Sequence, residues 1–427
     1  MAMNKEASME QYFDRLWPIC RSITGNGLRE SLNILSEIIP LQLTEVPTGT
    51  KVFDWEVPKE WNIRDAYILT PDGKKICDFK VNNLHVMNYS IPVDQEISFE
   101  ELDKHLFSLP NMPDAIPYLT SYYRETWGFC ITQNERDTLP KKGMYKVKID
   151  STLAPGSLTY GECILKGETD EEILFSTYVC HPSLANNELS GPLVTAFLYK
   201  KLAALPKRKY TYRFVFAPET VGVIAFLSKN GMYLKEKIHA GYVLTCVGDD
   251  GAYTYKRSKD ETKAVNRVAE HVLEHSGNKY SVIDFAIGGS DERQYCSPGF
   301  NFPVGSLMRT MYQRYKEYHT SLDNKSFISF PAMEETVNMY FDIARLHELN
   351  QNYLNAVQYC EPQLGKRGLY PELGGQKERA EKLSMRLHLL SWADGKTDLL
   401  TIAKRFGKPA LDFEETITEL IDKNLLT

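Results

Sequence analysis

The spacing of apolar residues follows two different patterns along this chain, and the pattern changes near residue 145. Beyond that point, short apolar runs typical of buried strands alternate with stretches in which apolar residues recur at helical spacing. The expected strands are 144–149, 158–165, 172–180, 210–217, 240–247, 280–287 and 303–307, and the expected helices are 192–205, 221–234, 262–276 and 332–353. Such alternation predicts an α/β domain with a mostly parallel or mixed sheet covered by helices.

The part of the chain before residue 145 contains a second pattern. Residues 8–39 carry apolar side chains on one helical face, and 41–47 alternates apolar and polar residues as a strand does. From 49 to 144, short β-like runs are separated by Pro and Gly turn signals and are rich in aromatic residues. The pattern predicts a small β-sandwich at 49–144, inserted into an α/β domain made of 1–48 and 145–362.

Three short helical stretches, 380–392, 398–406 and 413–424, end the sequence after a Gly- and Pro-rich linker at 361–375. Their number and length predict a winged-helix-like domain at 370–427. Its basic residues are offset by acidic ones, so it has no basic stripe suited to DNA. A role in packing, or in dimerisation to a homo-oligomer, is therefore favoured over nucleic-acid binding.

Composition narrows the class of protein. The 427 residues have a formal net charge of −6, which gives no general case for nucleic-acid binding. No apolar run is long enough to span a bilayer, and the first residues lack the basic-then-apolar order of a signal peptide. The eight cysteines are scattered without a CxxC motif. We expect a cytoplasmic protein with reduced thiols and no membrane association.

Polar residues that can carry chemistry gather where the predicted strands end. His181 follows the strand 172–180, and Glu219 follows the strand 210–217. In open α/β sheets, ligands collect at the carboxyl ends of strands. His319, in a polar and aromatic loop, is a candidate second imidazole. Two histidines and one glutamate would suit a metal site with a neighbouring base, although Glu219 could also be a helix-start acid favoured by the dipole.

A second polar group is expected to bind the substrate. Ser290 to Tyr295 (SDERQY) follows the strand 280–287, and Arg309 follows the strand 303–307. An arginine beside acids usually forms a structural ion pair, but at a strand end it could bind a substrate carboxylate through two hydrogen bonds. The predicted substrate-binding residues are Asp291, Glu292, Arg293, Tyr295, Arg309 and Tyr318.

Several of these motifs are similar to those of the zinc aminopeptidase and glutaminyl cyclase superfamily. The matching residues are His181, Asn187-Glu188-x-Ser190-Gly191, Pro218-Glu219-Thr220 and Tyr318-His319-Thr320. More closely, the chain resembles a bacterial aminopeptidase-like family associated with polysaccharide biosynthesis. Members of that family combine an aminopeptidase-like domain, an inserted β-sandwich and a C-terminal winged helix, so the resemblance implies the same architecture here. It also implies that His181 and His319 are metal ligands and that Glu219 is the general acid/base.

The sequence departs from the superfamily at three positions where acids are expected. Asn187 occupies the place of a bridging aspartate, and Thr220 and Thr245 occupy the places of two other acidic ligands. A two-metal site needs several anionic ligands to offset four positive charges. We therefore expect a single divalent ion, zinc by analogy, whose third ligand is either Glu188 or Asn187.

Three functions fit the sequence. The first is a mononuclear, zinc-dependent hydrolase or acyl transferase that acts on an amide bond of a small polar or short peptide-like substrate. The second is a catalytically impaired relative that binds a small ligand without a tightly held metal. The third is a regulator that binds DNA through its C-terminal winged helix.

Overall fold

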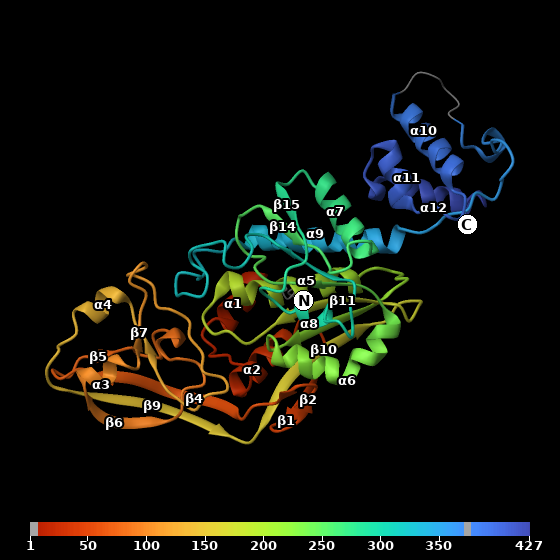
Figure 1. Ribbon diagram of the computed structural model, residues 1–427. Helices are drawn as coiled ribbons and strands as arrows, with labels where there is room; N and C mark the ends of the chain where they lie inside the picture. Colours follow the sequence, from red (N-terminus) through yellow and green to blue (C-terminus); the bar gives the residue numbers. More distant parts are fainter. Residues whose placement is uncertain (1–6, 371–376) are drawn as a thin grey trace, which may run out of the picture. The chain divides into compact units, whose positions relative to one another are not determined.

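The computed structural model describes residues 7–370 and 377–427, which form two compact units (Figure 1). The first unit runs to Glu261 and continues over Tyr280–Val337. The second unit consists of Thr262–Lys279 and of the chain from Asn338 onward. No helix among the described residues combines the length and apolar character that crossing a bilayer requires.

An eight-stranded mixed sheet is the centre of the first unit. Its order is β1 (Gln42–Pro47), β10 (Ser157–Leu165), β12 (Thr211–Ala217), β11 (Glu172–Tyr178), β13 (Ile238–Val243), β16 (Val304–Met308), β14 (Tyr253–Lys256) and β15 (Tyr280–Ile283). The strands β12, β11, β13 and β16 are parallel, whereas β10 and β14 pair antiparallel with β12 and β16. Every residue of β11 and β12 is buried, as expected for central strands covered on both faces.

Helices connect the parallel strands. The chain passes from β11 through α5 (Ser190–Ala203) to β12, and from β12 through α6 (Val221–Lys237) to β13. The helix α5 lies directly against the strand ends at Gly191, where a Cβ atom would be only 2.5 Å from the carbonyl oxygen of Leu244. Outside the insertion described next, this unit also contains α1 (Met9–Leu16), α2 (Asn26–Leu35), the short α8 (Glu292–Tyr295) and the start of α9 (Phe330–Leu349).

A smaller β domain interrupts the large sheet between β1 and β10 (orange and yellow in Figure 1). Its four-stranded antiparallel sheet has the order β5 (Lys75–Ile76), β4 (Glu60–Leu69), β9 (Met144–Ala154) and β6 (Val93–Ser98). Apolar side chains of that sheet share one core with the paired strands β7 (Leu106–Phe107) and β8 (Phe129–Cys130). The hairpin β2 (Lys51–Val52) and β3 (Trp55–Glu56) and the short helices α3 (Phe99–Asp103) and α4 (Gln133–Asp137) complete the insertion.

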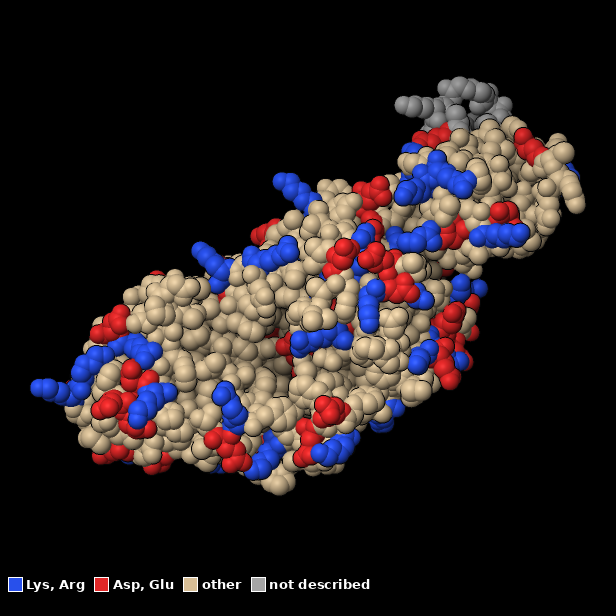
Figure 2. All heavy atoms as spheres, viewed as in Figure 1, with Lys and Arg blue, Asp and Glu red and all other residues tan. Residues whose placement is uncertain are grey.

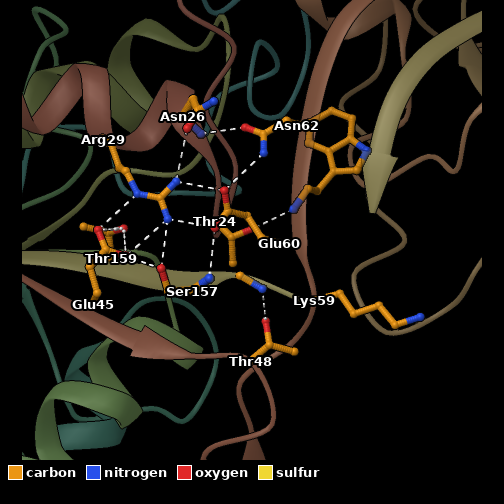
Figure 3. Close-up of polar contacts among 12 residues, drawn as sticks. Thr24, Asn26, Arg29, Glu45, Thr48, Lys59, Glu60, Asn62, Ser157 and Thr159 are labelled. Atoms are coloured by element: carbon orange, nitrogen blue, oxygen red, sulfur yellow. Dashed lines mark hydrogen bonds and ion pairs between the residues drawn. The ribbon is translucent and has the colours of Figure 1, made fainter. Parts of the chain in front are cut away.

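Arg29 of α2 ties the two sheets together (Figure 3). Its guanidinium donates hydrogen bonds to Glu45 of β1 at 3.0 Å and to Glu60 of β4 at 2.7 Å. It also donates to the hydroxyl of Ser157 on β10 at 2.9 Å. One cation therefore links the helix, the end of the large sheet and the first long strand of the insertion.

The second unit is helical. It contains α7 (Ala264–His275), the later turns of α9, α10 (Lys377–Trp392), α11 (Leu399–Phe406) and α12 (Glu414–Asp422). Within it, Nε2 of His271 accepts a hydrogen bond from the backbone N–H of Ala410 at 2.8 Å. On the face drawn in Figure 2, the basic and acidic side chains of the described residues are interspersed.

The mixed α/β class is confirmed, and the predicted strands and helices have counterparts that differ by a few residues at their ends. The strand β14 was not predicted. The predicted linker 361–375 lies partly outside the described residues, and Gly365–Arg367 within it forms a short 3-10 turn. The exact domain boundaries stay predictions, although β9 continues in the smaller sheet as far as Ala154.

Candidate active site

His181 lies just beyond the end of β11, and its ring is oriented by a buried carboxylate. Its Nδ1 is 2.7 Å from Oε2 of Glu188. Its Nε2 is directed to the other side, 3.5 Å from Oε2 of Glu219. Glu188 accepts the hydrogen bond of the Nδ1–H group, so Nε2 is the nitrogen that can serve as a ligand or proton acceptor once it carries no proton. Metal-bound histidines are commonly held in this way.

Glu188 supports the histidine and faces away from the cavity. Its Oε1 accepts the backbone N–H of Cys180 and lies 3.9 Å from the Arg21 guanidinium, and the side chain is fully buried. Cys180, His181 and Glu188 bring potential ligand atoms within 4.8 Å of one another. However, burial raises the pKa of the Cys180 thiol to about 11, and both Glu188 oxygens are engaged. This geometry favours an orienting role for Glu188 over the ligand role considered from the sequence.

Glu219 follows β12, the neighbour of β11, so the strand order brings it to His181. The turn that carries it is strained. Thr220 has φ 64° and ψ −83°, and the N–H of Val221 donates to the Glu219 carbonyl at 2.9 Å. This is a γ-turn with positive φ, a rare conformation for a β-branched residue. Burial raises the pKa of the Glu219 carboxyl, and the nearby positive charges of His181 and Arg293 offset only part of that effect.

The segment at α8 holds this strained turn. The N–H of Thr220 donates to Oδ1 of Asp291 at 2.8 Å, and Arg293 donates to the Thr220 hydroxyl at 3.0 Å. Burial raises the pKa of Asp291 well above its usual range, and the adjacent Glu219 carboxylate adds to the rise. Asp291 and Glu219 are therefore two neighbouring buried acids, and each makes ionisation of the other less favourable.

His319 lies near His181 although it comes from a distant loop. Their ring centroids are 5.6 Å apart, close to the roughly 5 Å expected for two imidazoles that share one tetrahedral zinc ion. Burial, followed by the charge of His181, lowers the pKa of His319 to about 3, so its ring is neutral at pH 7. Tyr318 stacks on this ring at 3.9 Å, and Tyr118 meets both imidazoles edge-on at 5.0 and 5.2 Å.

Asn187 lies in a π-helical turn, Ala185–Leu189, which is fixed by Asp323. The carboxylate of Asp323 accepts the N–H groups of Asn186 and Asn187 at 2.6 and 2.9 Å. Nδ2 of Asn187 donates to the hydroxyl of Tyr178 at 3.0 Å. Its Oδ1 is buried and accepts no hydrogen bond from any described residue. A buried acceptor without a donor is a position suited to a cation or a water molecule.

A cavity of about 450 Å³ opens over His181, Glu219 and His319. Its walls contain Ile23, Trp55, Tyr118, Leu119, Thr120, Tyr122, Tyr123, Cys180, His181, Glu219, Thr220, Val221, Arg293 and His319. The polar, reactive groups come from the α/β domain and the aromatic side chains from the insertion. The sequence analysis did not single out Trp55, Tyr118, Tyr122 and Tyr123, which line the cavity, although the aromatic richness of 49–144 is a signal that could have found them.

The structure brings only part of the predicted substrate-binding set to this cavity. Arg293 lines it, and Asp291 and Tyr318 support residues that line it. Tyr295 is buried and donates to the hydroxyl of Ser176 at 2.9 Å, and Glu292 is in a buried ion pair with Lys256.

Arg309 is also bound elsewhere. Its guanidinium donates to Thr336 at 3.0 Å, to Tyr253 at 3.1 Å and to Glu335. Arg309 and Glu292 therefore have the structural contacts that the sequence offered as the alternative to substrate binding.

The chemistry of the candidate ligands suits one divalent ion better than two. His181 and His319 offer imidazole nitrogens, and Oδ1 of Asn187 is a neutral oxygen that has no hydrogen-bond donor among the described residues. Thr245 is already engaged with Tyr178 at 2.5 Å, and Thr220 has no charge. The charge needed to hold two dications side by side is therefore missing.

The fold is that of the zinc aminopeptidases. The structure of a zinc aminopeptidase from Bacillus subtilis matches 80% of this chain and 94% of its own, with a TM-score of 0.55 and 12% identity. A crystal structure from Clostridium acetobutylicum, titled "putative peptidase", matches 98% of this chain and 95% of its own, with a TM-score of 0.91 and 46% identity. These matches confirm the aminopeptidase-like architecture expected from the sequence.

The chain belongs to the family described as "Domain of unknown function (DUF4910)", whose model matches residues 10–350. A winged helix-turn-helix model matches residues 351–427, which confirms the predicted class of the C-terminal domain. A relative from Clostridium acetobutylicum is 50% identical over 394 residues, covering 92% of this chain and 90% of the relative. Its name describes a polysaccharide biosynthesis protein, qualified as putative, with an aminopeptidase-like domain.

Proposed function

We propose that this protein is a hydrolase of amide bonds in small polar substrates and that it uses one divalent metal ion, zinc by analogy with its fold. The observation that carries the proposal is the meeting of His181 Nε2 and the Glu219 carboxylate, 3.5 Å apart, in the wall of one cavity. His319 lines the same wall. The name of the Clostridium relative further supports a place in polysaccharide biosynthesis.

In this proposal His181, His319 and the Asn187 oxygen hold the ion. When bound, the ion would polarise the amide carbonyl and lower the pKa of a water molecule. Glu219 accepts a proton from the attacking water and delivers it to the nitrogen of the departing amine. Burial raises the pKa of Glu219, which makes its carboxylate a better acceptor of the water proton.

The walls of the cavity also contribute. Tyr118 and Tyr122 are joined through their hydroxyls at 2.9 Å, and burial raises the pKa of both phenols well above the usual range. Both therefore remain protonated, and because one hydroxyl donates to the other, the second is left to donate a hydrogen bond to the substrate. The same base and metal would also serve acyl transfer, because that reaction differs only in the group that accepts the acyl unit.

A second function has one specific observation in its favour. Asn187, Thr220 and Thr245 are neutral where the superfamily has acids. In the second proposal the cavity binds a small ligand, but metal affinity is too weak for hydrolysis.

Metal analysis and activity of one set of variants separate the two proposals. We expect the purified protein to bind one zinc per chain and to hydrolyse amides. Glu219→Gln should keep the metal and lose at least about 100-fold in kcat. Asn187→Asp should tighten metal binding by adding a charge, while Asn324→Asp adds the same charge elsewhere and should not. If the wild type binds no metal and only Asn187→Asp binds zinc and hydrolyses amides, the second proposal is correct.

A further inference from the structure

Arg293 is an unusual cation because, among the described residues, no carboxylate lies close enough to form a direct ion pair with it. Among the described residues its guanidinium has one acceptor, the Thr220 hydroxyl at 3.0 Å, and it forms no ion pair. Its Nε is buried without any hydrogen-bond partner. Other enclosed cations are paired: Arg213 binds Glu172 at 2.6 Å, and Lys256 binds Glu292 at 2.5 Å.

Arg293 lies in the cavity wall, where its guanidinium can reach a bound substrate. Its side chain lines the wall beside Thr220 and Glu219, and its positive charge acts on the Glu219 carboxyl. A guanidinium with free N–H groups binds a carboxylate strongly through charge-assisted hydrogen bonds. The unpaired donors are therefore suited to an anion that belongs to the substrate.

The same wall offers nothing to a substrate ammonium group. Glu219 is the only acidic residue among those that line the cavity, and the proposed reaction requires it as the base. A free α-amino group would also face the positive charge of Arg293 at short range, which is unfavourable in a poorly solvated site. The residues of the cavity thus favour an acylated amine over a free one.

Glu219 and Arg293 together fix the side of the scissile bond on which the anion lies. The base returns its proton to the departing nitrogen, so the amine half of the substrate must lie beside Glu219. Since Arg293 adjoins Glu219, the carboxylate belongs to that same half. The apolar and aromatic wall formed by Ile23, Trp55 and Tyr123 is then left for the acyl half.

We infer that the substrate is an N-acyl amino acid, or a peptide C-terminal residue, whose carboxylate is bound by Arg293. This inference rests on the proposed amide hydrolysis. In the reaction, the amide C–N bond breaks and the water oxygen bonds to the carbonyl carbon. One water proton passes through Glu219 to the nitrogen. The products are a carboxylic acid and a free amino acid.

Three matched probes test the substrate class with the zinc-loaded, full-length protein. They are N-acetyl-L-phenylalanine, its carboxamide N-acetyl-L-phenylalaninamide, and L-phenylalaninamide, with alanine and glutamate series alongside. We expect kcat/KM for the carboxylate probe to exceed that for its carboxamide by at least about 100-fold in one series or more, and the free-amine probe to be the poorest. Preference for the free-amine or uncharged probes in every series would overturn the inference while leaving the proposed hydrolysis intact.

Arg293→Met assigns the preference to this residue. The variant should raise KM for the carboxylate probe at least about tenfold more than it raises KM for the carboxamide, because both probes share any effect on Glu219 and only the carboxylate loses its partner. Arg293→Lys, which keeps the charge but loses the forked geometry, should lie between the two. Arg124→Met, which removes a charge from an exposed position in the insertion, should behave as the wild type. An equal loss for both probes in Arg293→Met would contradict carboxylate binding.

Binding measurements keep the inference separate from the chemistry. If no probe is hydrolysed, the proposed function fails, and calorimetric titration with N-acetyl-L-phenylalanine, N-acetyl-L-alanine and N-acetyl-L-glutamate then decides the inference. Binding that weakens at least about tenfold in Arg293→Met supports it. Absence of binding for all three, or equal binding by wild type and variant, overturns it.

Discussion

At the residue scale, the site depends on side chains that hold other side chains. Glu188 is fully buried and does not line the cavity, yet it orients the ring of His181 through a 2.7 Å hydrogen bond at Nδ1. The strained positive-φ conformation of Thr220 places Glu219 next to the same histidine. The reactive atoms are therefore positioned by buried polar contacts made behind them.

This arrangement predicts the effect of Glu188→Gln. The amide keeps the shape of the carboxylate but removes the charge that orients His181 and favours its ligand form. Zinc affinity should fall about 10- to 100-fold, as for other residues that orient a metal-bound histidine. Competition with a chromogenic chelator measures the change, with far-UV circular dichroism confirming the fold. Glu168→Gln, which neutralises an exposed acid, should keep wild-type affinity, and equal affinities in all three proteins would contradict the role given to Glu188.

Sequence could predict that His181 and Glu219 lie together, because each follows a long apolar strand and strand ends of a parallel sheet share one edge. It could not predict the direction of Glu188, since that depends on the π-helical turn at Ala185–Leu189, which has no clear sequence signature. Nor could it bring Tyr118 to the histidines. That contact depends on how the insertion folds back, with the Tyr118 N–H donating to the carbonyl of His319 at 2.8 Å.

At the element scale, close packing of α5 against the central strands sets the position of the loop that carries Asn187. Gly191 is the point of closest approach, with the Leu244 carbonyl and the Thr177 hydroxyl each 2.5 Å from the position of a Cβ atom. A methyl group there has to displace backbone. The strands β11 and β12 could be predicted from sequence because every one of their residues is buried, which gives an almost continuous apolar run.

Gly191→Ala should therefore destabilise the protein by about 2–3 kcal/mol, the usual cost of overpacking at a rigid contact. Urea unfolding followed by tryptophan fluorescence measures the change. Gly299→Ala serves as the matched control, because a Cβ atom there would meet no other atom within 4 Å. Equal stabilities of the two variants would show that α5 can shift without cost.

The ion-pair network around Arg29 gives a second prediction at this scale. Arg29→Met should cost about 1–2 kcal/mol after allowance for solvent screening, since three elements lose their shared partner. Arg29 is the main cause that lowers the pKa of Glu60 to about 2. That contribution is present above the usual pKa of 4.5 and is lost as the pH falls toward 2.

Urea unfolding at pH 7 and pH 3 measures both effects. The difference between wild type and Arg29→Met should be large at pH 7 and smaller at pH 3. Arg64→Met is the control, because it removes an exposed pair with Asp150 and should have little effect at either pH. A constant difference at the two pH values would contradict the link to Glu60.

Short polar strands were the elements that sequence could not predict. β14 has four residues, and one of them, Lys256, carries a charge that argues against a buried strand. The structure resolves this conflict by pairing Lys256 with Glu292 at 2.5 Å in the interior. Because Glu292 is far from Lys256 in the sequence, the pattern of residues around β14 cannot predict this ion pair.

At the scale of the whole molecule, the chain joins an aminopeptidase-like unit to a helical unit. The stability of each unit depends on pH through a different group, Glu60 in the first and His271 in the second. In the helical unit, burial and the neighbouring His275 lower the pKa of His271 to about 4. Its neutral Nε2 accepts the Ala410 N–H. A histidine with a lowered pKa stabilises the fold above its usual pKa of 6.5, and the stability is lost as the pH falls from 6.5 toward 4.

His271→Gln should remove this proton-linked loss. Thermal unfolding measured between pH 7 and pH 4 should show a shallower fall in Tm than for the wild type over that range. His275→Gln, a change at an exposed position of the same helix, should keep most of the wild-type slope. Identical slopes in wild type and His271→Gln would mean that other groups cause the acid sensitivity.

The central claim is that a single metal ion lies between His181 and His319 with Glu219 beside it. Anomalous X-ray diffraction from zinc-equilibrated crystals, collected on both sides of the zinc absorption edge, tests this claim most directly. We expect one anomalous peak within about 2.0–2.2 Å of a nitrogen of each histidine, with the Asn187 side chain in contact and Glu188 still bound to Nδ1 of His181. Two peaks, or no peak at this position under saturating zinc, would contradict the account.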